Sequence, residues 1–264
     1  MEVKLFPHST RPGVGLRPRQ ESQRPLLPQH SRHCPVLEAG STSGFLVYPP
    51  LAENEASHVE YLGEGRYKFT FFMGAPGSGW DPVFAINYAL PIGAIGRIRE
   101  DVEFMQETPI APDGARQIAR MFIVPEDLGT PAGAITLRGA TNFKTPPGWD
   151  TVYTPIFNNT DRPVAPMLVV RVETDWYMHE TEFRYVLEPG EGIPGSRNIP
   201  IGQVLFVPRE RVTLTDCTDD ELAEIKQSKK KFARDKAAVT LSTPYGFQYS
   251  PHYARESKSR RDQP

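Results

Sequence analysis

The stretch RYKFTFFMGAPGSGWDPVFAINYAL, residues 66–90, decides the fold class. Two runs rich in apolar and aromatic residues, 66–73 and 84–90, flank a segment of Gly, Pro, Ser and Asp. Short runs bounded by such turn-forming residues are typical of β-strands joined by turns. The pattern continues from Phe45 to Pro208, and we expect strands at residues 44–48, 66–73, 84–90, 95–104, 134–139, 151–156, 166–173, 182–187 and 202–208.

The proline content and the order of the predicted elements narrow the fold further. The 264-residue chain contains 27 prolines, and each proline inside a helix removes a backbone donor and costs about 3 kcal/mol. Since no crossover helices separate most of the strands, the sheets should be antiparallel. We therefore predict a mainly β protein, an antiparallel β-sandwich or barrel of the jelly-roll, cupin-like or β-clip type, with a C-terminal helix.

Charge is unevenly distributed, although the formal net charge is only -2. Residues 1–33 carry six Lys and Arg against two Asp and Glu, residues 226–264 carry ten against three, and the middle is acidic. Charged blocks at chain ends are typical of solvated tails; the alternative is that basic arms lie across an acidic body, their own or a neighbouring subunit's. Neither basic segment interleaves aromatic residues for base stacking, so nucleic acid is not an expected partner.

These patterns predict three regions. They are an extended basic arm over residues 1–35, a β body over 36–215, and a C-terminal helix and basic tail over 216–264 that docks on the body. No apolar run approaches the ~20 residues needed to span a bilayer, and the N-terminus lacks the apolar core of a secretory signal. We expect a cytoplasmic protein without membrane contact.

Two helices are expected beside the strands. A short one begins near Asp113 and ends before Pro125. The longer one begins at Thr218, which forms a capping box with Glu221. The polar residues 254–264 that follow are expected to be disordered.

The densest group of polar side chains is VETDWYMHETEF, residues 172–183. If this segment is a strand, Asp175 and His179 share one of its faces. A carboxylate and an imidazole inside a β-barrel suit a divalent metal such as Fe or Zn, with the further histidine supplied by His252 or His33. The alternative is an exposed or hydrogen-bonded polar turn.

The segment KTPPGWD, residues 144–150, predicts a rigid loop, because its two prolines fix φ and Gly148 adopts conformations closed to other residues. An indole on such a loop, that of Trp149, lines a ligand pocket or plugs the end of a barrel. We expect Thr145, Trp149, Glu173 and Asp175 to form one cluster, in which Thr145 or backbone amides donate hydrogen bonds to Asp175. The candidate ligand-binding residues are these four and Trp176.

Four stretches resemble an uncharacterised bacterial and phage β-protein family of unknown function. They are CPVLEAGSTSGFLVYPP (34–50), FKTPPGWDTVYTP (143–155), VRVETDWYMHETEFRYVLEPGEG (170–192) with IPIGQVLFVPRERV (199–212), and PYGFQYSPHYAR (244–255). The family has a Thr-Pro-Pro-Gly-aromatic loop and a Val-Glu/Asp-Thr-Asp motif. The matching positions here are Cys34, Ser43, Gly44, Thr145, Pro146, Pro147, Gly148, Trp149, Glu173, Thr174, Asp175, His252 and Tyr253. This resemblance implies no reaction.

A more distant likeness is to the β-clip fold of the trimeric dUTPases and dCTP deaminases. The order VRVETDWY then IPIGQVLFV is similar to two of their strands, but Arg171 stands where those enzymes have glycine, and no Arg-Ser-Ser segment lies upstream. The likeness implies a homo-oligomer, with a trimer as the expected form, and does not imply the nucleotide pyrophosphatase reaction.

The sequence therefore favours a small-molecule-binding or assembly-forming β-barrel protein of unassigned biochemistry. Two alternatives remain open. One is a metal-dependent cupin-like enzyme with non-haem Fe or Zn that acts on a small molecule, and the other is a dUTPase-like nucleotide-binding protein.

Overall fold

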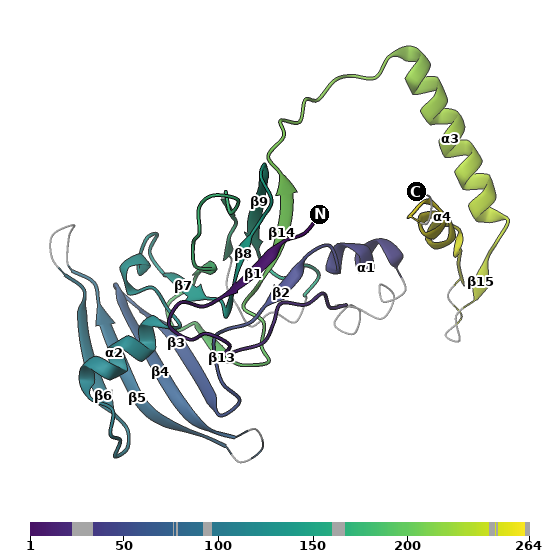
Figure 1. Cartoon of the computed structure of the whole chain (residues 1–264). Coiled ribbons are helices and arrows are strands. Elements are labelled where there is room, and N and C mark those ends of the chain that lie inside the picture. The colour runs from purple at the N-terminus through teal and green to yellow at the C-terminus, as the bar shows by residue number, and fades with distance from the viewer. Residues whose placement is uncertain are drawn as a thin grey trace. The chain divides into compact units, whose positions relative to one another are not determined.

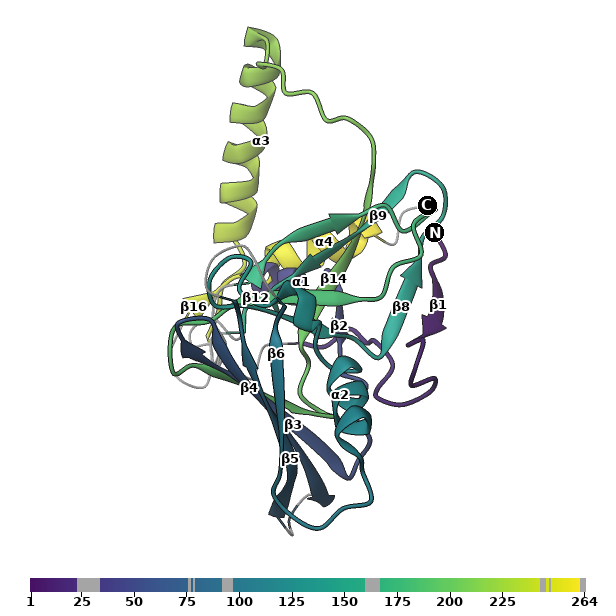
Figure 2. The ribbon, with the colours of Figure 1, turned by 90° about the vertical axis from the view of Figure 1, so that its left-hand side faces the viewer.

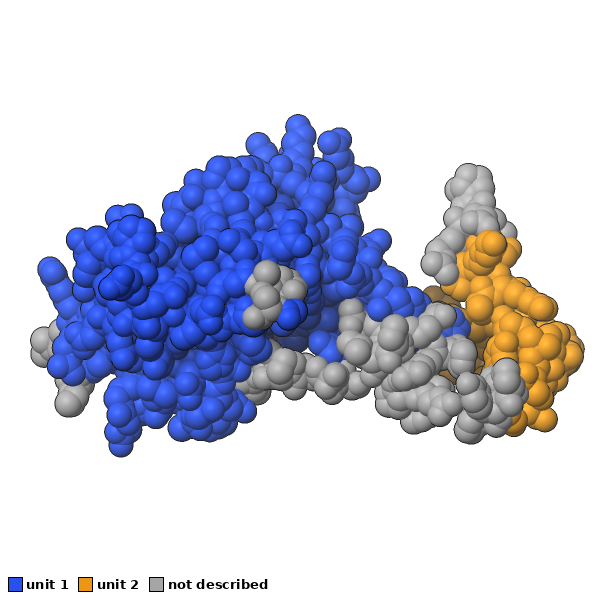
Figure 3. Space-filling view, turned by 90° about the horizontal axis from the view of Figure 1, so that it is seen from below, with its two compact units in different colours: residues 1–209 blue, residues 210–264 orange. Residues whose placement is uncertain are grey.

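The structure of the chain is a computed structural model that describes residues 1–22, 34–75, 77, 79–91, 97–159, 167–242, 246 and 248–261. It divides into two compact units, Met1–Arg209 and Glu210–Pro264, which Figure 3 shows in different colours. The boundary lies a few residues before the predicted start of the C-terminal region at 216. Each unit is described by itself.

The first unit consists mainly of β-strands (Figure 1). Its strands are β1 (Lys4–Pro7), β2 (Phe45–Val47), β3 (Glu55–Gly63), β4 (Arg66–Ala75), β5 (Gly79–Ala89), β6 (Arg99–Phe104), β7 (Ala134–Arg138), β8 (Thr141–Lys144), β9 (Trp149–Thr154), β10 (Met167–Leu168), β11 (Val170–Val172), β12 (Glu182–Val186), β13 (Gly192–Ser196) and β14 (Gly202–Pro208). Its α-helices are α1 (Pro35–Ser41) and α2 (Pro112–Arg120), and a 3₁₀ helix covers Pro125–Asp127.

The largest sheet has five antiparallel strands in the order β13-β3-β4-β5-β6. Alternation along β4 turns Phe69 and Phe71 to one face, where both rings stack on Phe122, just after α2. Figures 1 and 2 show α2 lying against this sheet. Burial of these aromatic side chains joins the helix to the sheet in one core.

Two smaller sheets position the candidate site. One has the order β11-β9-β14-β2 and the other the order β10-β12-β7, and all their pairs are antiparallel. The short segment 167–172 links them, because β10 pairs with β12 whereas β11 pairs with β9. Buried side chains from both sheets, among them Tyr153 and Phe183, belong to the common core.

The described part of the N-terminal arm belongs to the first unit. Strand β1 pairs with β8, and Arg19 forms an isolated bridge with Leu46. The guanidinium of Arg11 donates two hydrogen bonds to the Glu55 carboxylate, at 2.7 and 2.8 Å. Residues 1–22 thus lie across their own body, as one of the two readings of the charge pattern predicted.

The second unit contains α3 (Asp219–Ala237), a small hairpin of β15 (Leu241–Ser242) and β16 (Gln248–Tyr249), and α4 (His252–Arg261). The predicted capping box is present, since Thr218 and Glu221 bond each other's backbone N–H reciprocally. The sequence predicted disorder over residues 254–264. This prediction is wrong for residues 254–261, which belong to α4. The predicted docking of this unit on the body stays a prediction.

The predicted fold class is confirmed: the protein is mainly β, with antiparallel sheets consistent with a β-sandwich and with a C-terminal helix. Sequence patterns did not predict β1, β3, β8, β13, β15, β16, α1 and α4. Strand β3 was not predicted because polar residues interrupt its apolar pattern, namely Glu55, Ser57, His58 and Glu60. Among the described residues, no helix combines the length and apolar composition needed to cross a membrane.

Candidate functional site

One wall of the candidate site is formed by β9 and β11. Their antiparallel register places Val170 opposite Tyr153 and Val172 opposite Thr151. Because side chains alternate along a strand, Tyr153, Val170 and Val172 share one face. The opposite face carries Arg171, whose guanidinium bonds to Asp150.

The second wall is formed by β12 and β7. The register pairs Glu182 with Arg138 and Arg184 with Thr136, so these four polar side chains lie on one face. The alternate residue Phe183 is fully buried in the core on the other face. One face of this pair of strands is therefore polar, and the opposite face is apolar.

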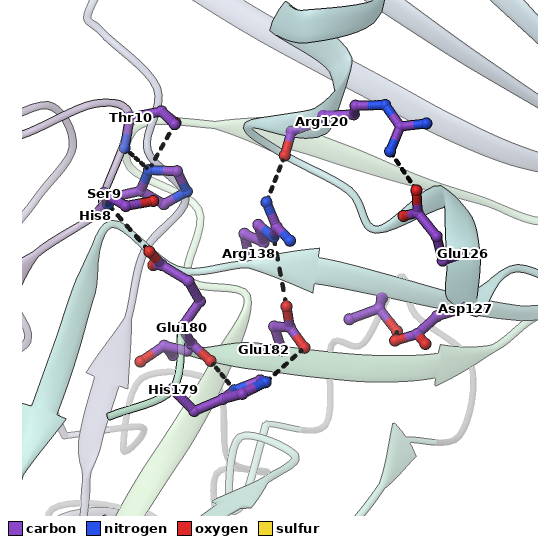
Figure 4. A network of polar contacts seen from close by, with 12 residues as sticks. His8, Ser9, Thr10, Arg120, Glu126, Asp127, Arg138, His179, Glu180 and Glu182 are labelled. Atoms are coloured by element: carbon purple, nitrogen blue, oxygen red, sulfur yellow. Dashed lines mark hydrogen bonds and ion pairs between the residues drawn. The ribbon is translucent and has the colours of Figure 1, made fainter. Parts of the chain in front are cut away.

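The loop between β11 and β12 brings His179 to the same place. Its ring Nδ1 lies 2.5 Å from the backbone oxygen of Glu180, and its Nε2 lies 3.8 Å from Oε2 of Glu182. Figure 4 shows the imidazole between these two partners. The ring of Tyr177, from the same loop, lies tilted against the His179 ring at a centroid distance of 5.2 Å.

Together these elements line a cavity of about 270 Å³ that is partly open to solvent. It is lined by Thr136, Tyr153, Val170, Val172, Tyr177, His179, Glu182 and Arg184. The volume lies just below the usual range for small-ligand sites, ~300–1,000 Å³. The lining combines apolar and aromatic side chains with a few polar groups, which is the usual composition of such sites.

The hydroxyl of Tyr153 is buried beneath the surface of this cavity. The residue is 2% exposed, and its hydroxyl lies beside the buried hydroxyl of Thr181. Burial raises the pKa of Tyr153 to about 12 against the opposing hydrogen bond with the Thr181 side chain, so the phenol is protonated at neutral pH.

The charged side chains of the cavity have partners of opposite sign. Arg184 bonds to Asp127 and, at 3.2 Å, to the Thr136 hydroxyl. Glu182 lies 3.4 Å from Nε of Arg138. Burial raises the pKa of Glu182, against the opposing effects of His179 and Arg138.

The raised pKa of Glu182 predicts a pH-dependent effect of Glu182→Gln. A raised pKa in the folded state means that the wild type loses stability as pH rises from the ordinary value towards the folded one. The Gln variant should therefore gain free energy of unfolding relative to the wild type as pH rises above the ordinary value of 4.5, measured by denaturant unfolding.

Glu180→Gln is the matched control with the opposite sign. Burial raises the pKa of Glu180, but the hydrogen bonds from Ser9 and Asn142 outweigh it and lower the net value. This variant should lose stability relative to the wild type at pH 7, and the loss should vanish in acid. The same pH trend in both variants would contradict the assignment.

A second polar cluster, the Arg209 cluster, joins residues from two of the four stretches that carry the family resemblance. Asp150 accepts hydrogen bonds from Arg171 at 2.6 Å and from Arg209 at 2.6 and 2.8 Å. Arg209 also donates to Asp175 at 2.6 Å and lies 3.5 Å from Glu173. Its cation is thus surrounded by three carboxylates.

The structure brings together the residues that the sequence analysis grouped around the loop. The amide of Gly148 donates to Asp175 at 2.9 Å, so the predicted bond from a backbone amide is present. Thr145 donates instead to the Trp149 carbonyl, at 2.6 Å, and its hydroxyl lies 2.9 Å from that of Thr174.

The two tryptophans of the predicted ligand-binding set differ in burial. Trp149 is half-buried at the start of β9, whereas Trp176 is 65% exposed and donates to Glu173 at 2.5 Å. Neither belongs to the lining of the cavity around Tyr153.

The expected placement of Asp175 and His179 on one strand face is wrong. Residues 173–181 form a turn and a loop, Asp175 bonds to Arg209 and Gly148, and His179 faces Glu182. In the described part of the chain, no group of three or more His, Cys, Asp or Glu side chains is arranged to hold a metal ion.

The other two histidines proposed as metal ligands cannot be placed beside Asp175. His252 belongs to the second unit, where its ring lies 4.9 Å from that of Phe232. His33 lies outside the described residues. The Fe or Zn hypothesis thus gains no support from the described residues.

The sequence analysis named His179 but missed the cavity residues Thr136, Tyr153, Glu182 and Arg184. One signal was available, since Glu182 and Arg184 alternate with Phe183 and Tyr185 in a predicted strand. No sequence pattern marked Tyr153, whose cross-strand neighbours Val170 and Val204 are more than 15 residues away in the chain.

Comparisons of the chain with family models, with curated proteins and with solved structures gave no match. The resemblance to a family of unknown function, the β-clip likeness and the threefold assembly stay predictions.

Proposed function

We propose that the protein binds a small, uncharged organic molecule in the cavity around Tyr153. The observation that carries this proposal is the lining of the pocket, which combines the apolar side chains of Val170 and Val172 and the ring of Tyr177 with a few polar groups. Such a composition is usual for sites that bind small organic molecules.

The lining supports an uncharged ligand with an apolar body. Arg184 and Glu182 are already opposed by Asp127 and Arg138, so a charged ligand would compete with these pairs. Val170, Val172 and Tyr177 offer apolar contact. The ligand class is therefore a small, largely apolar and uncharged molecule, such as an aromatic ketone.

The Arg209 cluster supports a structural role rather than a binding role. Arg209 meets three carboxylates of its own chain, and Asp175 accepts from both Arg209 and Gly148. A ligand would have to displace these charge-assisted bonds, which are about twice as strong as neutral ones.

Binding can be tested with acetophenone as the neutral probe and with benzoate and benzylamine as its charged counterparts. Saturation-transfer NMR should show that acetophenone binds to the wild type and that the two ions bind more weakly. Val170→Phe adds bulk at the cavity wall and should abolish binding of acetophenone.

Val36→Phe is the control, because Val36 is 53% exposed on α1 and does not line the cavity. It should bind acetophenone as the wild type does. Equal binding by Val170→Phe and the wild type, or no binding of acetophenone to the wild type, would refute the proposal.

A further inference from the structure

A second cavity lies between the N-terminal arm and the strands β2, β8 and β14. Its volume is about 640 Å³, which falls within the usual range for small-ligand sites, and it is partly open to solvent. The lining consists of residues 1–5 and 17–18 of the arm and three phenylalanines, Phe45, Phe143 and Phe206. None of these residues lines the cavity around Tyr153.

The three phenylalanine rings form an aromatic floor. The antiparallel register of β14 and β2 places Phe45 opposite Val204, so Phe45 and Phe206 share one face of their sheet. The ring of Phe206 contacts both others, at centroid distances of 5.9 Å from Phe45 and 5.5 Å from Phe143. Phe143 is 1% exposed and anchors the floor, whereas Phe45 and Phe206 are only partly buried. A flat apolar body can therefore pack on two exposed ring surfaces.

The same lining carries unpaired positive charge. Lys4, on β1, and Arg17 are both exposed, and Glu2 is the one acidic residue beside them. Neither cation forms an ion pair with another residue in the part of the chain that the structure describes. Arg11 of the same arm differs, because it is paired with Glu55. The lining thus has a net positive charge, with two cations available to a ligand.

We infer that this second cavity binds an organic anion with an aromatic body of at least two rings. The rings pack on Phe45 and Phe206, and the acidic group is attracted to Lys4 and Arg17. This preference for charge is opposite to that of the cavity around Tyr153, where the charged side chains already have partners. The inference adds a second site and does not depend on the proposed function.

The size of the cavity favours a body larger than one ring. Because the free energy of burial grows with the apolar area removed from water, a two-ring anion gains more from the floor than a single ring does. Benzoate covers only part of the floor and should bind here more weakly than a two-ring anion.

Two dyes that differ in one group separate the effect of charge from that of the rings. Anilinonaphthalene sulfonate and N-phenylnaphthylamine have the same rings, but only the first carries a sulfonate. Both fluoresce in apolar surroundings, so titration gives an affinity for each. Affinity for the sulfonate should fall as salt is added, because salt screens exposed charges, whereas affinity for the amine should not.

The double variant Lys4→Gln/Arg17→Gln should weaken binding of the sulfonate by about tenfold and leave binding of the amine unchanged. Phe45→Leu should weaken binding of both dyes by about threefold, since both use the ring contact. The matched control is Arg97→Gln/Arg99→Gln, which changes the net charge equally at two exposed arginines outside the cavity. It should bind both dyes as the wild type does.

Glu2→Gln should change affinity in the opposite direction. It removes the acidic residue of the lining, so the sulfonate should bind about twofold more tightly and the amine as before. Circular dichroism on every variant checks that the fold is retained.

Val170→Phe distinguishes the two cavities. It adds bulk to the cavity around Tyr153 and should leave both dye affinities unchanged. Loss of dye binding in this variant would place the dyes in that other cavity and overturn the inference, while the proposed function would stand. Equal affinity of the wild type and Lys4→Gln/Arg17→Gln for the sulfonate, or no saturable binding to the wild type, would overturn it as well.

Discussion

Replacement of Asp150 with Ala should lower the free energy of unfolding by about 3 kcal/mol. The side chain of Asp150 is only 3% exposed, and its two oxygens accept hydrogen bonds from Arg171 and Arg209. Without the carboxylate, Arg171 keeps only its bond to the Pro208 carbonyl, Arg209 keeps Asp175 and Glu173, and the link that Asp150 makes between β9, β11 and the end of β14 is lost. Thermal unfolding should show a melting temperature lower by about 6–12 °C.

Asp175→Ala is the matched comparison within the Arg209 cluster. It removes another partner of the same arginine, but at a more exposed position, so its effect should be smaller. A larger loss for Asp175→Ala than for Asp150→Ala would contradict this account of the cluster.

Acid should lower the free energy of unfolding of the wild type by protonating Asp150. Burial raises the pKa of Asp150, but the hydrogen bonds from Arg209 and Arg171 outweigh burial and lower it below its ordinary value of 3.8. Its contribution to stability is therefore complete above that value and is lost as pH falls towards the lowered pKa. The difference between wild type and Asp150→Ala should shrink below pH 4 in the same unfolding experiment.

Gly133→Ala should cost about 3 kcal/mol, the second large effect. Gly133 has a φ of +80°, and a Cβ at this position would lie 2.2 Å from the backbone oxygen of Leu187. That oxygen belongs to the segment after β12, and Gly133 itself accepts a hydrogen bond from the Leu187 amide at 3.0 Å. The contact can be relieved only by moving backbone, and urea unfolding should show the loss of stability.

Gly190→Ala separates strain from the steric clash. Gly190 has a φ of +86°, but a Cβ there would meet no atom within 4 Å. This variant should lose only the cost of the left-handed conformation, about 1–2 kcal/mol. Equal losses for the two variants would show that the Leu187 contact does not contribute.

Local sequence patterns predicted those parts of the structure that depend on neighbouring residues. The strands around residues 66–90 and the capping box at Thr218 follow from short-range rules of alternation and helix capping. The bond from the Gly148 amide to Asp175 also followed from the rigid loop.

The cavity could not be predicted in the same way. Its walls come from β7, β9, β11 and β12, and their pairing depends on contacts between segments distant in the chain. The prediction of a strand through residues 173–181 is also wrong, because these residues form a turn and a loop, in which side chains do not alternate between two faces.

The most direct test of the central claim is NMR of the protein carrying ¹³C at the Cζ of its ten tyrosines. The Tyr153 signal is assigned with Tyr153→Phe, and acetophenone is then added to the wild type. We predict that the Tyr153 signal shifts with acetophenone concentration, whereas that of Tyr185, whose hydroxyl donates to the Ile201 carbonyl, stays unchanged. A Tyr153 signal that does not move while acetophenone binds to the protein would contradict the account.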